Sequence, residues 1–208
     1  RVLFRSFIPL LNSWGFYGHQ HINQYAVFLL PPEMMVLFKP HLDHITEHAV
    51  DPDKRRYVIS TEGPRHYIDM DHYGNYPFDT LPRQWNSAKE IFSEDSLNAH
   101  GIVPWWIQVM LAKLTKAFRE GDMDDILRLS ADLGHYIADS HVPLHNTENY
   151  NGQLTGQRGI HGFWESTIPE LRAEDYDLFT GRAAYVKSPL DFAWNTCEVS
   201  FSAVDTVL

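Results

Sequence analysis

Cysteine is nearly absent from this sequence of 208 residues, and its scarcity excludes two kinds of architecture. The single cysteine, Cys197, can form neither an intrachain disulfide framework nor a zinc site built from several thiolates. Hydrophobic residues make up 44% of the sequence, which is enough for an ordinary buried core. No low-complexity stretch indicates disorder. The sequence therefore predicts a folded chain without disulfides.

Long apolar runs are also missing. No segment reaches the roughly 18 to 20 apolar residues that a membrane-spanning helix requires. Residues 1–13, RVLFRSFIPLLNS, combine two arginines with a short apolar run and end in the small residue Ser13. This pattern is typical of the second half of a secretory signal peptide cleaved before Trp14, so we interpret residues 1–13 as a signal-peptide remnant or N-terminal extension. We accordingly expect a secreted or periplasmic protein; the alternative is an N-terminal segment that packs on the domain.

Basic residues are in the minority. The chain has 17 Lys and Arg against 27 Asp and Glu, and its formal net charge is −10. This balance disfavours tight non-specific binding to nucleic acid or to an anionic membrane surface. Bound divalent cations would change the local field, because a substrate anion responds to the charge close to it more than to the net charge.

Alternating strand patterns and fixed-period repeats are absent, and helical periodicity dominates. We therefore expect an all-α, multi-helical bundle with a metal cleft, formed by one domain that covers residues 14–208. The sequence ends inside an expected helix, so the C-terminus of this domain can be incomplete. Prolines at 31, 32 and 40 end or interrupt the first two helices. A helical pattern extends over residues 22–38, with the break or end at Pro31 and Pro32, and a second helical stretch covers 33–49. Further helices are expected at 105–119, 122–141, 161–171 and 189–207. The expected loops cover 51–83 and 146–160.

Two His–acid pairs have the spacing that a helix converts into a shared metal site. His135 and Asp139, and again His161 and Glu165, lie four residues apart in expected helices, so both side chains of a pair project from one face. His145 follows just past the expected helix end, where a turn can return it to the carboxylate of Asp139. Imidazole and carboxylate ligands without sulfur are typical of zinc sites.

The surroundings of these pairs indicate burial. Leu133, Ile137 and Leu144 flank the first pair, and Phe163 flanks the second. Buried charged groups require partners. A single pair is more typical of a solvated surface, but two pairs together favour a metal centre. Further candidates elsewhere in the sequence are His19, His66 and Asp69.

The ordered series of motifs resembles one known superfamily, which joins the zinc-dependent phospholipases C with the single-strand-specific nucleases of fungal type. The motifs are WGFYGH at 14–19, PDKRR at 52–56, RHYIDMDH at 65–72, LGHYIADSHVPLH at 133–145 and GIHGFWE at 159–165. The resemblance covers most of the chain and implies a helical bundle with up to three Zn²⁺ ions in a cleft.

The resemblance also implies which residues bind each ion. Asp139 bridges the first two ions. The other ligands are Trp14 and His19 for the first ion, Asp53, His66 and His135 for the second, and His145, His161 and Glu165 for the third. Asp53 is favoured because PDKRR matches a P-D-x-x-R pattern, and Asp51 stays an alternative. Trp14 would bind through its α-amine, which requires cleavage before it; an intact Arg1 in the native protein would contradict this form of the hypothesis.

The implied activity is hydrolysis of a phosphodiester by hydroxide held between two zinc ions, with Asp139 and Asp53 as catalytic residues. The His-x-x-x-Glu form of the last motif is similar to the phospholipase branch, whereas the WG-x-x-GH opening is similar to the nuclease branch. Tyr17 stands where the phospholipase branch carries Glu. We expect a phospholipase C-like enzyme whose substrate is a phospholipid headgroup. The alternatives are a single-strand-specific nuclease of the 3′-nucleotidase type, acting on single-stranded nucleic acid, and a non-catalytic zinc-binding module.

Overall fold

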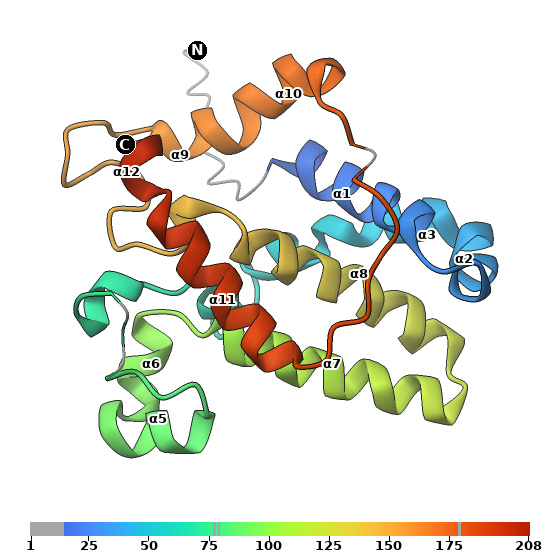
Figure 1. Cartoon of the computed structure of the whole chain (residues 1–208), viewed down its shortest axis with the longest axis horizontal. Coiled ribbons are helices and arrows are strands. Elements are labelled where there is room, and N and C mark those ends of the chain that lie inside the picture. The colour runs from blue at the N-terminus through green and yellow to red at the C-terminus, as the bar shows by residue number, and fades with distance from the viewer. Residues whose placement is uncertain (1–14, 77, 79, 179) are drawn as a thin grey trace, which may run out of the picture.

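The computed structural model describes residues 15–76, 78, 80–178 and 180–208, and within these ranges all regular elements are helices (Figure 1). The expected all-α class is thereby confirmed for the described part of the chain. Residues 1–13 and Trp14, to which the sequence assigns a leader and a zinc ligand, lie outside the described residues. No helix in the described ranges is both long enough and apolar enough to cross a bilayer.

Two long antiparallel helices, α7 (Val103–Glu120) and α8 (Met123–Ser140), form the centre of the fold (Figure 1). Pro104 lies in the first turn of α7, where its missing N–H costs no hydrogen bond. Gly121 ends α7 in the left-handed region, with φ of 70°. Asp122 then caps α8 by accepting a hydrogen bond of 3.1 Å from the Asp125 backbone N–H. These local signals explain why helices were predictable here.

The other helices pack around this pair. α1 (Phe16–Leu29) contacts α8 and α3, and α11 (Pro189–Ser202) lies across α7 and α8 (Figure 1). The shorter helices are α2 (Pro32–Phe38), α3 (Leu42–Glu47), α4 (Asp51–Arg55), α5 (Trp85–Phe92), α6 (Glu94–Ala99), α9 (Ile160–Gly162), α10 (Ile168–Arg172) and α12 (Val204–Val207). A π-helical turn, Phe163–Thr167, joins α9 to α10.

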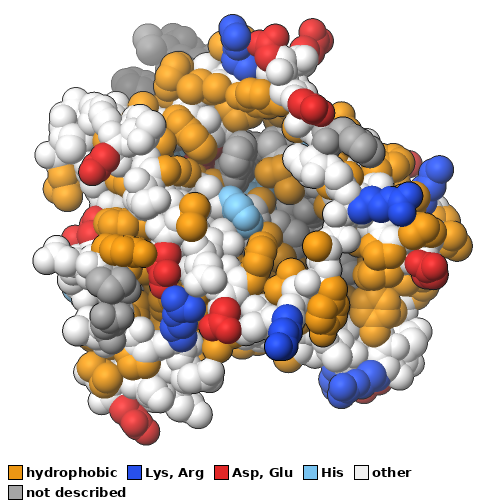
Figure 2. Space-filling model, in the orientation of Figure 1, with side chains coloured by type: hydrophobic (Ala, Val, Ile, Leu, Met, Phe, Trp, Pro, Cys, Tyr) orange, Lys and Arg blue, Asp and Glu red, His pale blue; other side chains and the backbone are white. Residues whose placement is uncertain are grey.

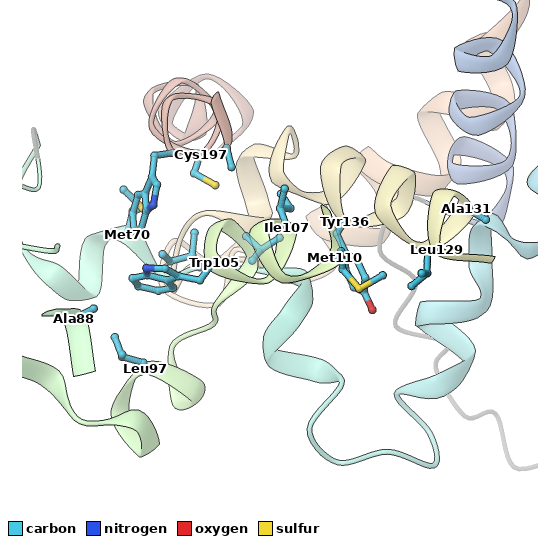
Figure 3. Packing of buried hydrophobic residues seen from close by; sticks show 14 of the residues in the cluster. Met70, Ala88, Leu97, Trp105, Ile107, Met110, Leu129, Ala131, Tyr136 and Cys197 are labelled. Atoms are coloured by element: carbon cyan, nitrogen blue, oxygen red, sulfur yellow. The ribbon is translucent and has the colours of Figure 1, made fainter. Parts of the chain in front are cut away.

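The apolar core lies between α7, α8, α11 and the chain around Met70 (Figure 3). Trp105 and Trp194 pack edge to face with ring centroids 4.9 Å apart, an arrangement that the quadrupoles of two aromatic rings favour. Cys197 is completely buried beside them and acts as a small apolar side chain. This core fixes the orientation of α8, and α8 carries two of the predicted ligands.

A close contact sets the position of α1 against α8. Gly134 lies where any Cβ atom would collide with the side-chain amide of Asn23. Asn23 in turn donates a hydrogen bond of 3.0 Å to the Ala131 carbonyl. Since His19 stands one turn before Asn23 on α1, this contact carries His19 to the face of α8 that holds His135.

Three expectations about local structure require correction. The first helix starts at Phe16 rather than near residue 22, and α5 and α6 occupy a region for which no helix was expected. The segment 51–83 is not a loop throughout: it begins with α4 and includes 3-10 turns at Gly63–His66 and Met70–Tyr73. The prolines of this segment suggested a loop, but Pro52 lies in the first turn of α4, where proline favours a helix.

Candidate metal centre

Asp139 stands at the centre of a buried cluster, and each oxygen of its carboxylate faces two imidazoles. Its Oδ1 lies 3.4 Å from Nε2 of His19 and 3.5 Å from Nδ1 of His145. Its Oδ2 lies 2.9 Å from Nδ1 of His66 and 3.2 Å from Nε2 of His135. Residues from α1, α8, the turn Gly63–His66 and the turn Pro143–His145 therefore meet at one carboxylate.

The structure distinguishes Asp53 from Asp51, the two aspartates that the sequence leaves as alternative ligands. Asp53 is buried, and its Oδ1 lies 3.8 Å from Nδ1 of His66 and 3.9 Å from Nε2 of His135. Asp51 is partly exposed and instead pairs with His48 and Lys54. Asp53 is therefore the aspartate that lies at the cluster.

A second group lies next to the first. Nε2 of His161 is 3.1 Å from Oε2 of Glu165, and Nε2 of His145 is 3.5 Å from Oε1 of the same carboxylate. The rings of His145 and His161 lie nearly parallel, with centroids 5.2 Å apart. The predicted four-residue spacing of His161 and Glu165 thus does place both side chains on one face, across the π-helical turn.

Backbone carbonyls orient three of the histidines. In each, Nδ1–H donates a hydrogen bond to a carbonyl and leaves Nε2 directed toward a carboxylate. The pairs are His135 with Ala49 at 2.8 Å, His145 with His66 at 2.8 Å, and His161 with Tyr150 at 3.0 Å. A hydrogen bond of this kind on one ring nitrogen is the usual way in which proteins present the other nitrogen to a metal ion.

The distances within the cluster match those between ligands of one ion. Zinc binds imidazole nitrogen at about 2.0–2.1 Å, so two ligands of a tetrahedral ion lie roughly 3.4 Å apart. The separation of Nε2 of His19 from Oδ1 of Asp139 is 3.4 Å, and that of Nε2 of His145 from Oε1 of Glu165 is 3.5 Å. These separations are too long for good hydrogen bonds but suit two atoms that share a cation.

Several polar atoms of the cluster are buried without a hydrogen-bond partner among the described residues. They are both ring nitrogens of His19, Nε2 of His66, Oδ1 of Asp139 and both carboxylate oxygens of Glu165. Burial of so many polar atoms without hydrogen bonds costs free energy unless a cation satisfies them. The residues present therefore fit a group of divalent ions.

The protonation of the cluster is uneven. Burial opposes ionisation of Asp139, but the imidazoles of His135 and His145 outweigh it and hold the pKa of this carboxyl well below its usual range. Burial disfavours a charged His145, yet Glu165 and Asp139 raise the pKa of that imidazole to about 9. Burial lowers the pKa of His66 to about 4, so His66 is neutral at pH 7 and presents a free lone pair.

A cavity of about 470 Å³ opens beside the cluster. His66, His145 and His161 line it together with Tyr67 and Tyr150. The lining also includes Arg56, Asp69, Thr147 and Glu148. Three of the predicted ligands therefore border a cavity that a small molecule could occupy. On the face of the molecule shown in Figure 2, acidic and basic side chains are scattered and form no patch of one sign.

Glu62 is a member of this site that the sequence reasoning missed. It is completely buried, accepts a hydrogen bond from the Tyr136 hydroxyl and forms an ion pair with Arg65. Its Oε1 lies 3.8 Å from Nε2 of His66. Glu62 precedes His66 by four residues, the same spacing as in the other two His–acid pairs. Glu62 could therefore have been predicted from the sequence by the same rule. Asp69, considered earlier as a metal candidate, lies beside His100 instead.

Comparisons of the chain with models of protein families, with curated proteins and with solved structures find no match. The resemblance to the phospholipase C and nuclease superfamily therefore stays a prediction from the motifs. Among the predicted ligands, all except Trp14 lie within the described residues, and the structure brings these eight together in two adjoining groups.

Proposed function

We propose that this chain is a zinc-dependent hydrolase of phosphodiesters. The observation that carries the proposal is the convergence of four imidazoles on the single buried carboxylate of Asp139. The donor set consists of nitrogen and oxygen, which suits zinc better than magnesium or calcium, since those ions prefer oxygen alone. When bound at such a site, zinc supplies Lewis acidity to a phosphoryl group and makes water a stronger acid.

The chain's own residues divide the remaining tasks. Asp139 and Glu165 supply the negative charge that holds cations in a buried place, and the carbonyl-oriented imidazoles fix where the ions lie. Asp53 faces His66 and His135 and is the candidate to accept a proton from water. Arg56 lines the cavity, 3.5 Å from Asp53, and its guanidinium can neutralise a phosphoryl oxygen of the substrate.

The cavity supports catalysis over a purely structural role for the metal. Structural zinc sites are closed by four protein ligands, whereas catalytic sites keep a position open to substrate. Here three of the proposed ligands line a cavity of about 470 Å³, which is large enough for a phosphate ester and its immediate substituents. This observation favours an enzyme over the non-catalytic zinc-binding module.

A phospholipase C-like activity is the substrate assignment that the motifs favour, and one structural observation supports the nuclease alternative. Tyr67 and Tyr150 both line the cavity next to the histidines. Aromatic rings beside a phosphate site can stack on unpaired bases, as proteins that bind single strands require. The two activities therefore predict different consequences of removing the same ring.

The test is a substrate panel with zinc-loaded enzyme: phosphatidylcholine, single-stranded DNA, RNA and bis-p-nitrophenyl phosphate. A phospholipase predicts lipid cleavage that Tyr150→Ala changes little, whereas a nuclease predicts nucleic-acid cleavage with KM raised several-fold by Tyr150→Ala. Tyr185→Ala, at a tyrosine that is 93% exposed, is the matched control. Full zinc content without hydrolysis of any diester would contradict the enzyme and favour the zinc-binding module.

A further inference from the structure

A separate group of side chains of the types that bind metal ions lies at the edge of the cavity, where Glu148 belongs to its lining. His72, His100 and Glu148, here termed the rim cluster, bring one potential ligand atom each within 4.8 Å of one another. Nδ1 of His72 lies 3.2 Å from Oε1 of Glu148, and Nδ1 of His100 lies 3.7 Å from the same oxygen. The resemblance assigns a ligand role to none of these residues, although His72 is the last residue of the motif at 65–72.

The two imidazoles of the rim cluster are stacked. Their centroids are 3.3 Å apart and their planes differ by 12°, so both Nδ1 atoms can be directed at the carboxylate of Glu148 from the same side. A divalent cation bound by both rings would balance the charge of the carboxylate that they face.

Hydrogen bonds hold the three segments of the rim cluster together. Asp71 accepts hydrogen bonds from the Thr147 hydroxyl at 2.7 Å and from the Glu148 backbone N–H at 2.9 Å. The Asp69 backbone N–H donates to the His100 carbonyl at 2.8 Å. The ligands are therefore positioned before any ion arrives, which reduces the entropy that binding has to overcome.

Asp69 adds a second carboxylate to the rim cluster. Its Oδ2 lies 3.1 Å from Nδ1 of His100, and its side chain is mostly buried. The carboxylate of Asp71 is also close, since it accepts the hydrogen bond from the Glu148 backbone N–H. A cation at this place would balance the negative charge of these neighbouring carboxylates.

We propose that the rim cluster is a further divalent-cation site, formed by His72, His100 and Glu148 with Asp69 beside them. The separations of 3.2 Å and 3.7 Å between nitrogen and oxygen are close to the roughly 3.4 Å expected for two ligands of one tetrahedral zinc ion. Imidazole with carboxylate selects zinc and neighbouring transition-metal ions over magnesium and calcium. The site does not depend on the proposed function.

The rim site differs from the buried centre in its exposure. The side chains of His72 and Glu148 are 34% and 44% exposed, whereas Asp139 is fully buried. Its ion is therefore bound more weakly and exchanges with solvent. Because Asp69 and Glu148 also line the cavity, that ion adds positive charge at the opening through which an anionic ligand enters.

Equilibrium dialysis against a range of free Zn²⁺, with zinc measured by plasma spectrometry, tests the site. We expect the full chain to bind one zinc in a weak class that His72→Ala and His100→Ala each abolish. Glu148→Gln, which conserves shape, is expected to weaken this class at least tenfold. His141→Ala is the matched control, because His141 is exposed and its imidazole contacts the Ile137 carbonyl and the ring of Phe192 rather than a carboxylate of the rim cluster.

Equal zinc content in the native protein and all three rim variants, at every concentration, would overturn the proposal. Circular dichroism of each variant verifies that the helices are retained, and Glu148→Gln keeps the test valid if a histidine variant does not fold. A chain that lacks tightly bound zinc but still loses one weak equivalent in the rim variants would contradict the proposed function and leave the rim site supported.

Discussion

Oδ2 of Asp139 lies 2.9 Å from Nδ1 of His66, although 73 positions separate the two residues in the sequence. The first belongs to α8 and the second to a short 3-10 turn in a segment that the sequence represented as a loop. The contact is buried on both sides. Any account of this chain has to explain why the fold brings these two groups together.

The first prediction concerns Asp139→Asn. The amide keeps the size of the carboxylate but removes the charge that four imidazoles face, so the variant is expected to lose bound zinc and to lower turnover of bis-p-nitrophenyl phosphate by orders of magnitude. Zinc analysis and steady-state kinetics on one sample measure both effects. Asp125→Asn, at an exposed acid on the same helix, is the control and should retain zinc and activity. Unchanged zinc content in Asp139→Asn would contradict the proposed role.

Chelation is expected to destabilise the fold. Without a cation, the unpartnered atoms of His19, Asp139 and Glu165 stay buried at a cost. An ion that binds only the folded state adds about 4 kcal/mol of stability at 1,000 times its Kd, so EDTA should lower Tm by many degrees. Added Zn²⁺ should restore Tm, and added Mg²⁺ should not. A Tm that is indifferent to EDTA would argue against buried metal.

Zinc binding is expected to release protons at pH 7. Because the pKa of His145 is raised to about 9 in the metal-free chain, its Nε2 carries a proton at pH 7 that an ion must displace. The sign follows directly: zinc affinity rises with pH until His145 is deprotonated, near pH 9, and this contribution is absent above it. Calorimetric titration of the metal-free protein in two buffers with different ionisation enthalpies measures the release. Identical heats in both buffers would show that no proton leaves.

Gly134→Ala tests how α1 is positioned. The added methyl group collides with Asn23 and forces α1 away from α8, and such overpacking costs about 1–3 kcal/mol. Because His19 lies on α1, the variant is also expected to bind less zinc than the native chain. Denaturant unfolding and zinc analysis measure both effects. Gly162→Ala is the control, since a Cβ there meets no atom within 4 Å. A Gly134→Ala variant that binds as much zinc as the native chain would show that zinc binding does not depend on this contact between α1 and α8.

Helical spacing is what made half of the site predictable. His135 with Asp139, and His161 with Glu165, could be paired from sequence because a helix places residues four apart on one face. On α8, four buried residues spaced four apart lie along one face of the helix, as helical periodicity predicts: Leu127, Ala131, His135 and Asp139. The all-α class followed from the same signal.

The rest of the site required three dimensions. Asp51 and Asp53 both lie in α4, and only the orientation of that helix decides which one faces His66. Helix α4 was not predicted because its segment is rich in proline. The number of prolines in a segment does not show whether one of them starts a helix or lies in a loop. The rim cluster joins residues 72, 100 and 148, and no spacing rule connects positions so far apart in the chain.

The most direct test of the central claim is anomalous X-ray diffraction at the zinc absorption edge from crystals grown with Zn²⁺. The account predicts peaks within about 2.0–2.2 Å of the carboxylate oxygens of Asp139 and Glu165. These peaks should vanish in crystals soaked with EDTA. Zinc-loaded crystals without any anomalous peak beside Asp139 would contradict the account.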